Sequence, residues 1–277
     1  MITDPLELVP SALRPTGLQL PTAVADALAG LSGMPAVAAP PEQLRLLRRL
    51  DSKYALPRAQ LPALLAGLAD RFVVLTSAGQ YAARYVTVYF DSDQQQLLHD
   101  HLRGRRPRHK LRVRHYLERR LSSLEIKSKT PGGRTDKQQR AHPFGSNILD
   151  AEARGWAALA TGLQQPVHAQ AWSSCQRITL LHTSAACRMT IDLNVSLGNR
   201  AQARTLQDRA LVELKREQSR GDAALSQALH AAGARPVGLS KYVAAMMDGG
   251  STERRARFVA VLGRLARSEY WQECRAC

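Results

Sequence analysis

The chain of 277 residues has few aromatic residues and no long apolar run. Phe, Tyr and Trp make up 5% of it, which argues against single-stranded nucleic acid as the ligand because such proteins stack bases on aromatic side chains. No apolar run approaches the roughly 18 to 20 residues that cross a bilayer. The first residues lack the basic start and hydrophobic stretch of a signal peptide. We therefore expect a cytoplasmic protein without a transmembrane segment.

Cysteine is also scarce, and the four cysteines do not favour a metal or redox function. Cys175 and Cys187 fall on or beside expected strands and are read as buried small side chains. Cys274 and Cys277 have C-x-x-C spacing, but no second pair of ligands lies near them in the sequence.

Positive charge, by contrast, is in large excess. The chain holds 39 Lys and Arg against 23 Asp and Glu, a formal net charge of +16. An excess of this size indicates an acidic partner, whether nucleic acid, an anionic membrane or a phosphate-rich ligand.

The most informative motif places three cations at every second position. Lys110, Arg112 and Arg114 alternate with Leu111 and Val113. In an extended strand alternate side chains leave on opposite faces, so the three cations share one face. At a spacing of about 7 Å neighbours on this face repel each other, which favours either a solvated surface or a bound anion.

The same alternation returns along the chain with acids added to the polar face. Expected strands carry such faces at residues 49–54, 84–91, 124–129, 177–180, 188–195 and 211–216. Two architectures fit: an antiparallel sheet with its charged face in water, or a barrel with the charged faces inside a polar tunnel and helices outside. The dominance of Arg and Lys favours the tunnel, because both suit phosphate oxygens. The predicted fold class is therefore α+β, an antiparallel β-barrel tunnel with helices packed outside.

Proline and charge divide the chain into three expected parts. Residues 1–40 are expected to form a flexible tail with one short helix around residues 23–31, residues 41–248 the tunnel domain, and residues 249–277 a basic helix. The cluster Arg103, Arg105, Arg106 and Arg108 is expected to be a solvated turn unless it guards a tunnel mouth. Pro131-Gly132-Gly133 predicts a turn or flexible loop carrying Arg134, Lys137 and Arg140, and Ser240 is an expected helix cap.

The order of these motifs resembles the VTC domain, the polyphosphate polymerase branch of the triphosphate tunnel metalloenzymes. The similarity rests on Asp51-Ser52-Lys53-Tyr54, Tyr89-Phe90-Asp91, the run from Lys110 to Tyr116, Leu124 to Lys129, Val212 to Lys215 and Leu239 to Tyr242. The wider superfamily often begins with E-x-E-x-K, and Arg49-Leu50-Asp51-Ser52-Lys53 departs from that pattern. The departure favours the polymerase-like branch.

The resemblance implies a tunnel that holds a triphosphate or polyphosphate together with Mn²⁺ or Mg²⁺. It assigns catalytic roles to Arg112, Arg114, Lys127, Arg177, Arg188 and Lys241, and phosphate binding to Lys53, Arg84, Lys110, Lys129 and Lys215. Glu213 is the expected metal ligand, Glu125 is a second, and Asp51 and Asp192 are weaker ones.

The function that follows is metal-dependent phosphoryl transfer, with polyphosphate synthesis from ATP as the first hypothesis. An inorganic triphosphatase or polyphosphatase and a non-catalytic polyphosphate-binding module are the alternatives. The expected partners are ATP or another nucleoside triphosphate and polyphosphate. Nucleic acid is disfavoured, because isolated acids on the basic faces would repel its backbone. A membrane-associated partner protein is left open.

Overall fold

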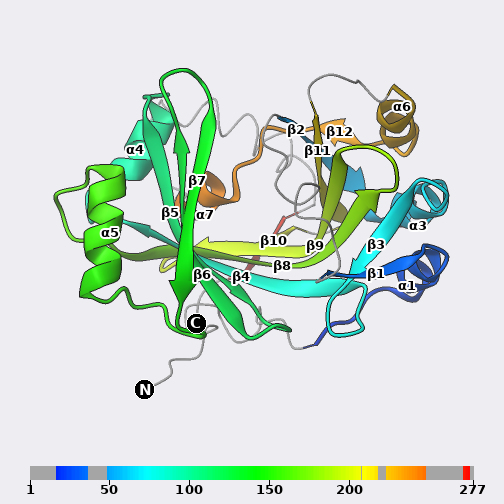
Figure 1. Cartoon of the computed structure of the whole chain (residues 1–277), viewed down its shortest axis with the longest axis horizontal. Coiled ribbons are helices and arrows are strands. Elements are labelled where there is room, and N and C mark those ends of the chain that lie inside the picture. Colours follow the sequence, from blue (N-terminus) through cyan, green and yellow to red (C-terminus); the bar gives the residue numbers. More distant parts are fainter. Residues whose placement is uncertain (1–16, 37–48, 207, 218–222, 248–270, 275–277) are drawn as a thin grey trace.

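The computed structural model describes residues 17–36, 49–206, 208–217, 223–247 and 271–274 (Figure 1). Thirteen strands make one sheet in this part of the chain. Its main path runs in the order β12-β2-β11-β9-β8-β4-β5-β6-β7. The pairs along this path are all antiparallel, and they cover β2 (Arg49–Pro57), β4 (Ala82–Asp91), β5 (Arg108–Tyr116), β6 (Leu121–Lys129), β7 (Thr135–His142), β8 (His168–His182), β9 (Cys187–Asn199), β11 (Arg209–Glu217) and β12 (Arg235–Pro236).

Four shorter strands lie off this path. They are β1 (Gly33–Pro35), β3 (Phe72–Thr76), β10 (Ala203–Leu206) and β13 (Trp271–Cys274). β1 pairs in parallel with β3, and β3 pairs with β8. β13 pairs with β10, which pairs with β9.

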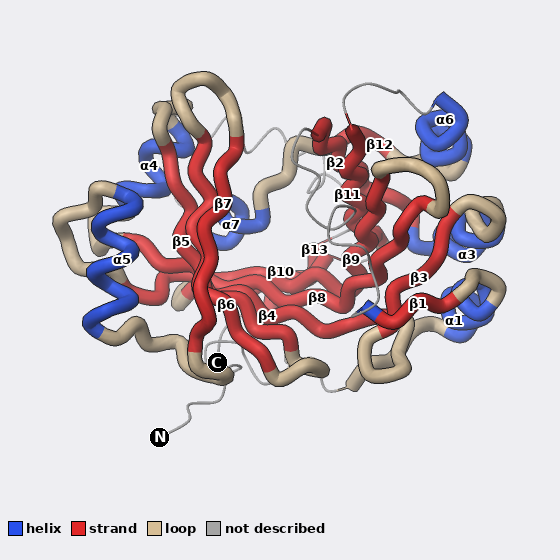
Figure 2. The backbone as a smooth tube through the Cα atoms, viewed as in Figure 1, coloured by secondary structure: helices blue, strands red, loops and turns tan. Residues whose placement is uncertain are grey.

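The helices pack on the outer face of the curved sheet (Figures 1 and 2), apart from α7, which contacts β8 and β9. They are α1 (Thr22–Ala29), the short 3₁₀ helix η3 (Arg58–Gln60), α3 (Leu61–Ala66), α4 (Gln96–Leu102), α5 (Ala151–Thr161), α6 (Ala223–Ala231) and α7 (Lys241–Met246). None of the described helices is both long and apolar enough to cross a bilayer.

Two hydrophobic clusters hold these layers together. In one, α5 covers Val88, Val113 and Ile126 on the outer face of β4, β5 and β6. In the other, α1, α3 and α6 cover Ile191 and Leu214 together with neighbouring apolar residues of β8, β9 and β11. Because the alternate residues of each strand are buried in these clusters, the charged residues between them face the concave side of the sheet.

The sheet curves around a hollow without closing into the expected barrel. The edge strands β12 and β7 do not pair with each other in the described part of the chain. β7 has the sequence TDKQQRAH, which is almost wholly exposed, and charged edge strands resist further pairing. The predicted fold class, an antiparallel sheet around a tunnel-like hollow with helices outside, is confirmed; in the described part of the chain the sheet does not close completely.

The segment Val237–Tyr242 spans part of the gap instead. Its Val237 backbone N–H donates to the Lys53 carbonyl of β2 at 2.9 Å. At the other side of the hollow, Lys110 Nζ of β5 donates to the Ser240 hydroxyl at 3.1 Å. Ser240 also caps α7, where its hydroxyl accepts from the Val243 N–H, as its sequence position predicts.

Over residues 17–36 the expected short helix is present as α1 (Thr22–Ala29), but this stretch packs against the sheet domain and is not a separate tail. Val24, Leu28 and Leu31 are buried, and β1 joins the sheet, because these apolar side chains complete the cluster beneath α3. The rest of that tail lies outside the described residues. Within the expected C-terminal helix, residues 271–274 form the strand β13; residues 248–270 and 275–277 are likewise not described.

Candidate active site

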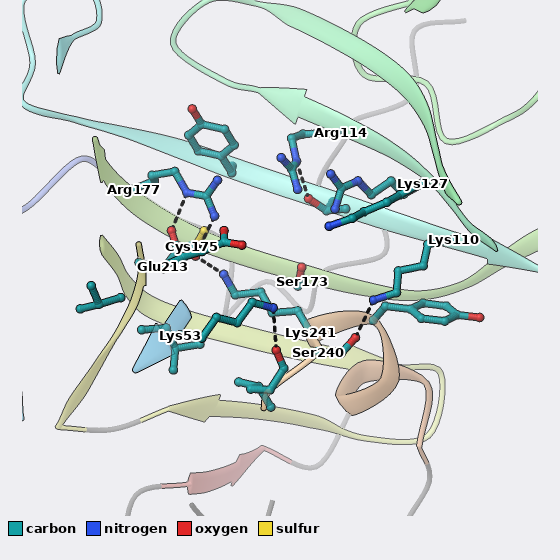
Figure 3. Close-up of a pocket in the computed structure, with 18 of the residues that line it drawn as sticks. Lys53, Lys110, Arg114, Lys127, Ser173, Cys175, Arg177, Glu213, Ser240 and Lys241 are labelled. Atoms are coloured by element: carbon teal, nitrogen blue, oxygen red, sulfur yellow. Dashed lines mark hydrogen bonds and ion pairs between the residues drawn. The ribbon is translucent and has the colours of Figure 1, made fainter. Parts of the chain in front are cut away.

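A cavity of about 170 Å³ opens on the concave face of the sheet (Figure 3). Strands β2, β4, β5, β6, β8, β9 and β11 and the segment Val237–Tyr242 contribute its walls. Its charged lining, within the described part of the chain, consists of eight cations and two carboxylates: Lys53, Lys110, Arg112, Arg114, Lys127, Arg177, Lys215, Lys241, Asp192 and Glu213. This lining has a formal charge of +6, so the cavity is built for an anion.

The cationic ladder of β5 lies as the alternation predicts. Lys110, Arg112 and Arg114 line the cavity, while Leu111 and Val113 are fully buried on the outer face. The neighbouring strand aligns Lys127 of β6 directly opposite Lys110. Cations that approach one another across paired strands repel, so this wall of the cavity is stabilised when a polyanion binds.

Glu125 of β6 lies directly opposite Arg112 of β5 and forms ion pairs with Arg112 and Lys137. Its side chain is fully buried and accepts hydrogen bonds from Arg112 Nε at 2.7 Å, Lys137 Nζ at 2.9 Å and the Tyr116 hydroxyl at 3.4 Å. Burial opposes ionisation, but Arg112, Arg114 and Lys137 outweigh it and hold the pKa of Glu125 well below its usual range. Glu125 is not part of the cavity lining, so its contacts favour orienting Arg112 over holding a metal.

Asp192 has a similar role on the opposite wall. Arg177 donates two hydrogen bonds to the Asp192 carboxylate, from Nε to Oδ1 at 2.6 Å and from Nη2 to Oδ2 at 2.8 Å. Lys241 Nζ donates to the same Oδ2. Burial opposes ionisation of Asp192, yet the two cations keep its pKa far below the usual range. In return Asp192 raises the pKa of Arg177 and that of Lys241. The Asp192 carboxylate therefore fixes in place two cations that line the cavity.

Glu213 differs from these two carboxylates because it borders the cavity and its ion pair is longer than theirs. Its side chain is 23% exposed, and Lys215 Nζ lies 3.4 Å from Oε1. Burial alone would raise its pKa, but Lys215, Lys53 and Arg177 lower the value to about 2. Glu213 is thus ionised at neutral pH and faces the space that a ligand would fill.

Lys110 is the cation whose charge is most strongly affected by its surroundings. Burial first, and then the positive charges of Lys127 and Lys53, lower its pKa to about 7. Burial also lowers the pKa of Lys127, an effect that Glu213 partly opposes. Close to neutral pH, then, a part of the molecules carries an uncharged Lys110 beside the Ser240 hydroxyl.

Three of the sequence-predicted cations do not line the cavity. Arg84 lies on the outer face of β4, where its Nε donates to Glu118 Oε1 at 2.6 Å. Arg188 and Lys129 lie on the same strand faces as cavity residues, but they stand near the ends of β9 and β6 and outside the lining. The assignment of Arg84 to phosphate binding does not fit this geometry, because strict alternation puts it with Val86 and Val88 on the apolar face.

Sequence reasoning missed several uncharged residues of the site. Tyr85, Thr87 and Tyr89 of β4 line the cavity, with Tyr242 of α7 and Cys175 of β8. The guanidinium groups of Arg114 and Arg177 lie 5.8 and 5.0 Å from the centre of the Tyr85 ring, close enough for a cation–π interaction. Alternation along β4 was the signal that could have found the three β4 residues.

Alternation fails locally in β9. Within the expected strand at residues 188–195, alternation puts Asn194 on the polar face with Asp192, but Asn194 has a φ of 50°. This left-handed residue coincides with a shift in the pairing of β8 with β9. Asn194 therefore turns to bind Arg58 and Gln176, and Val195 packs beside Cys175 instead.

The lining fits a divalent metal that is shared with a bound phosphate. No group of three or more His, Cys, Asp or Glu side chains comes together in the described residues, so a site made by protein ligands alone is not present there. Mg²⁺ is commonly bound through one or two carboxylates and the phosphates of the substrate. Glu213 is ionised and borders the anion site, so it can supply such an oxygen ligand.

Comparisons with known proteins place the chain in a family. Similar solved structures include a putative adenylate cyclase from Bacillus halodurans (12% identity, TM-score 0.40, covering 76% of this chain and 97% of that one). Another is HpAC1 from Hippeastrum, described as a putative adenylyl cyclase with a dominant triphosphatase activity (14%, TM-score 0.44, 74% and 98%). The PH1012 protein from Pyrococcus horikoshii is a third (12%, TM-score 0.38, 67% and 90%).

No curated protein sequence matches the chain significantly. The family model of the VTC domain, however, matches residues 48–248. This match covers most of the chain and contains every strand that contributes to the cavity wall. The chain belongs to the VTC domain family.

Proposed function

We propose that this protein catalyses metal-dependent phosphoryl transfer from a nucleoside triphosphate, and that the acceptor is the end of a growing polyphosphate chain. The observation that carries the proposal is the cavity itself, whose lining among the described residues contains eight cations and two carboxylates. One of these carboxylates, Asp192, is already paired with Arg177 and Lys241. The remaining positive charge matches a ligand with several phosphate groups.

Phosphoryl transfer asks little covalent chemistry of a protein. It requires that donor and acceptor oxygens lie in line and that the charge on the transferred group is stabilised. Arg114, Arg177 and Lys127 project into the cavity from three different strands, as Figure 3 shows. Cations that converge from separate walls can contact different phosphates of one chain. The ion pair of Arg177 with Asp192 and the hydrogen bond from Arg114 to the Thr87 hydroxyl orient these two side chains before the substrate arrives.

Glu213, in this proposal, would hold Mn²⁺ or Mg²⁺ together with phosphate oxygens. A divalent ion bound there supplies neutralisation of phosphate charge. The protein residues contribute the rest: Lys215 and Lys53 keep Glu213 ionised, and the arginines bind the phosphate oxygens that the ion does not reach. Glu125, closed within its own ion pairs, is assigned a positioning role for Arg112.

Water as the acceptor would turn the same site into a triphosphatase, and no transfer would make it a polyphosphate-binding module. The products separate the three. Purified protein is incubated with ATP and Mn²⁺ or Mg²⁺, and long-chain polyphosphate, free phosphate and nucleotide are resolved. We expect long-chain polyphosphate together with ADP. Free phosphate without chains would establish a hydrolase, and unchanged ATP would refute both enzymatic functions.

The role of Glu213 is tested with the variant Glu213→Gln. We expect turnover to fall by about a hundredfold or more, the scale seen when one charge-stabilising group is removed from an active site. Binding of tripolyphosphate without metal should stay equal or become tighter, because a negative charge leaves the cavity. The matched control is Glu217→Gln, an exposed residue of the same strand. Full activity of Glu213→Gln would contradict the assignment.

A further inference from the structure

A patch of basic residues lies at one end of the sheet and belongs to no part of the site described above. It is formed by the connection between α4 and β5 together with the end of β6 and the β6–β7 turn, and it consists of Arg103, Arg105, Arg106, Arg108, Lys129 and Arg134. Figure 1 shows these segments side by side at the end of β5, β6 and β7. We name these six residues the basic patch.

Contacts within the patch hold its two segments together. Arg106 Nη1 donates to the Pro131 carbonyl of the β6–β7 turn at 3.4 Å. Arg108 Nη1 donates to the Arg105 carbonyl at 3.3 Å, and Arg108 pairs with Lys129 across β5 and β6. Two cationic residues at directly opposite strand positions are unfavourable without an anion. The arrangement is therefore more than a set of scattered surface charges.

The patch continues the cationic face of the cavity. Arg108 precedes Lys110 by two residues on β5, and Lys129 follows Lys127 by two residues on β6. Residues two apart on a strand share a face about 7 Å from each other. Lys110 and Lys127 line the cavity, so positive side chains continue on one strand face from the cavity to Arg108 and Lys129. The exposed Arg105, Arg106 and Arg134 lie in the two segments that adjoin these strand ends.

Acidic side chains do little to neutralise the patch. Asp100 lies 3.4 Å from Arg105 in an exposed pair, which is a weak interaction at a surface. Asp136 of β7 stands opposite Ser128, a buried residue on the outer face of β6, so its side chain leaves on the other face of the sheet. Among the described residues, no other acid forms an ion pair with the patch.

The chemistry of the patch selects its ligand. Residues 103–108 and 129–134 contain no aromatic side chain for stacking bases and no large apolar side chain for entering a membrane. Closely spaced guanidinium groups suit phosphate oxygens. We propose that the basic patch is a second binding site for condensed phosphate, which holds the part of a long chain that extends out of the cavity. The proposal rests on the proposed function and adds a site to it.

The experiment compares a short and a long ligand in binding assays that need no turnover. The patch variant carries Arg105→Gln, Arg106→Gln and Arg134→Gln, three exposed positions. The control variant carries Arg119→Gln, Arg200→Gln and Arg235→Gln, which are also exposed but lie in other parts of the fold. Affinities for tripolyphosphate and for long-chain polyphosphate are measured by calorimetry over a range of salt concentrations, and single-stranded RNA is a third probe.

We expect the patch variant to bind tripolyphosphate as the wild type does and to bind long-chain polyphosphate about tenfold more weakly at low salt. Its affinity for the long chain should also depend less steeply on salt, because fewer cations release counterions. The control variant should match the wild type with both ligands. Equal long-chain affinity in the patch variant and the wild type, or an equal loss in the control variant, would overturn the proposal.

Two further outcomes separate the patch from the proposed function. If the wild type fails to bind tripolyphosphate, the proposed function fails, while a loss of long-chain binding confined to the patch variant still supports the patch. If RNA binds the wild type as tightly as long-chain polyphosphate and loses affinity in the patch variant, the patch is a nucleic-acid site and the proposal is wrong.

Discussion

The protonation of individual residues in and beside the cavity depends strongly on the charged groups around them. Asp192, Glu125 and Glu213 all keep a lowered pKa despite burial, because each faces at least two cations. Lys110 lacks such a carboxylate partner among its main influences, and its pKa falls to about 7. The same strand therefore carries a permanently charged Arg114 and a lysine that titrates near neutral pH.

This titration predicts a pH dependence of phosphate binding. A bound anion favours the charged form of Lys110. Below about pH 7 Lys110 already carries its proton, whereas above pH 7 ligand binding must be accompanied by uptake of a proton, which weakens the observed affinity. The ratio of tripolyphosphate affinity between the wild type and Lys110→Met should therefore fall as the pH rises from about 6 to about 9. Calorimetry across this range measures the ratio. A ratio that stays constant would show that Lys110 keeps its charge throughout.

We expect the variant Asp192→Asn to be less stable than the wild type, and we expect a bound polyanion to restore part of that stability. In Asp192→Asn the buried Arg177 and Lys241 lose their shared partner, and breaking a buried ion pair costs about 3 to 5 kcal/mol. Thermal unfolding should show a lower Tm for this variant and a larger rise of Tm with tripolyphosphate than in the wild type. Asp136→Asn, at an exposed position of β7, is the control. A Tm unchanged by Asp192→Asn would contradict this role.

At the scale of elements, α7 shapes one wall of the cavity. It begins at Lys241, which lines the cavity, and it continues the chain from the segment Val237–Tyr242. Its position depends on a buried contact in which the Tyr242 hydroxyl donates to Asp91 Oδ2 at 2.9 Å. Asp91 also accepts from the Leu97 and Leu98 N–H groups at the start of α4. One carboxylate thus ties β4, α4 and α7 together, and burial raises its pKa.

Tyr242→Phe tests this connection. The loss of one hydrogen bond to a buried carboxylate should lower the free energy of unfolding by about 1 to 3 kcal/mol. KM for the nucleotide should rise more than kcat falls, because the Tyr242 hydroxyl is bound to Asp91 and acts on the ligand by positioning Lys241 and Ser240. Urea unfolding and steady-state kinetics measure both effects, with Tyr81→Phe, between β3 and β4, as the control. An unchanged stability and KM would show that the Tyr242–Asp91 hydrogen bond does not position α7.

At the scale of the whole molecule, the described part of the fold places eight cations around the cavity, and their mutual repulsion opposes folding. A polyanion that binds the folded state removes this cost. At a ligand concentration about a hundred times Kd, tripolyphosphate should stabilise the protein by about 2.7 kcal/mol. Thermal unfolding with tripolyphosphate and with orthophosphate at equal concentration checks this. Absence of a Tm rise with tripolyphosphate would contradict a phosphate site.

Much of the fold was predictable where alternation along a strand was strict. β5, β6 and β11 place their charges as expected, because an apolar residue at every second position fixes the buried face. The sequence does not predict the strand β7. Its residues are mostly exposed and show no apolar alternation, so the sequence indicates a loop there. The expected place of Arg84 in the cavity differs from the structure, because the alternation of β4 puts Arg84 on the apolar face. The expected face of Asn194 also differs, because a bulge changes the face of β9 locally.

The sequence by itself determined which strand faces are charged, since period-two alternation depends only on local backbone geometry. It also carried the motifs of the VTC domain family. Only the tertiary structure decided which cations share a cavity, which carboxylates are held in ion pairs, and that the segment Val237–Tyr242 connects β2 with β5 across the hollow. These features depend on distances between segments far apart in the chain, and such distances follow from how the sheet curves and packs.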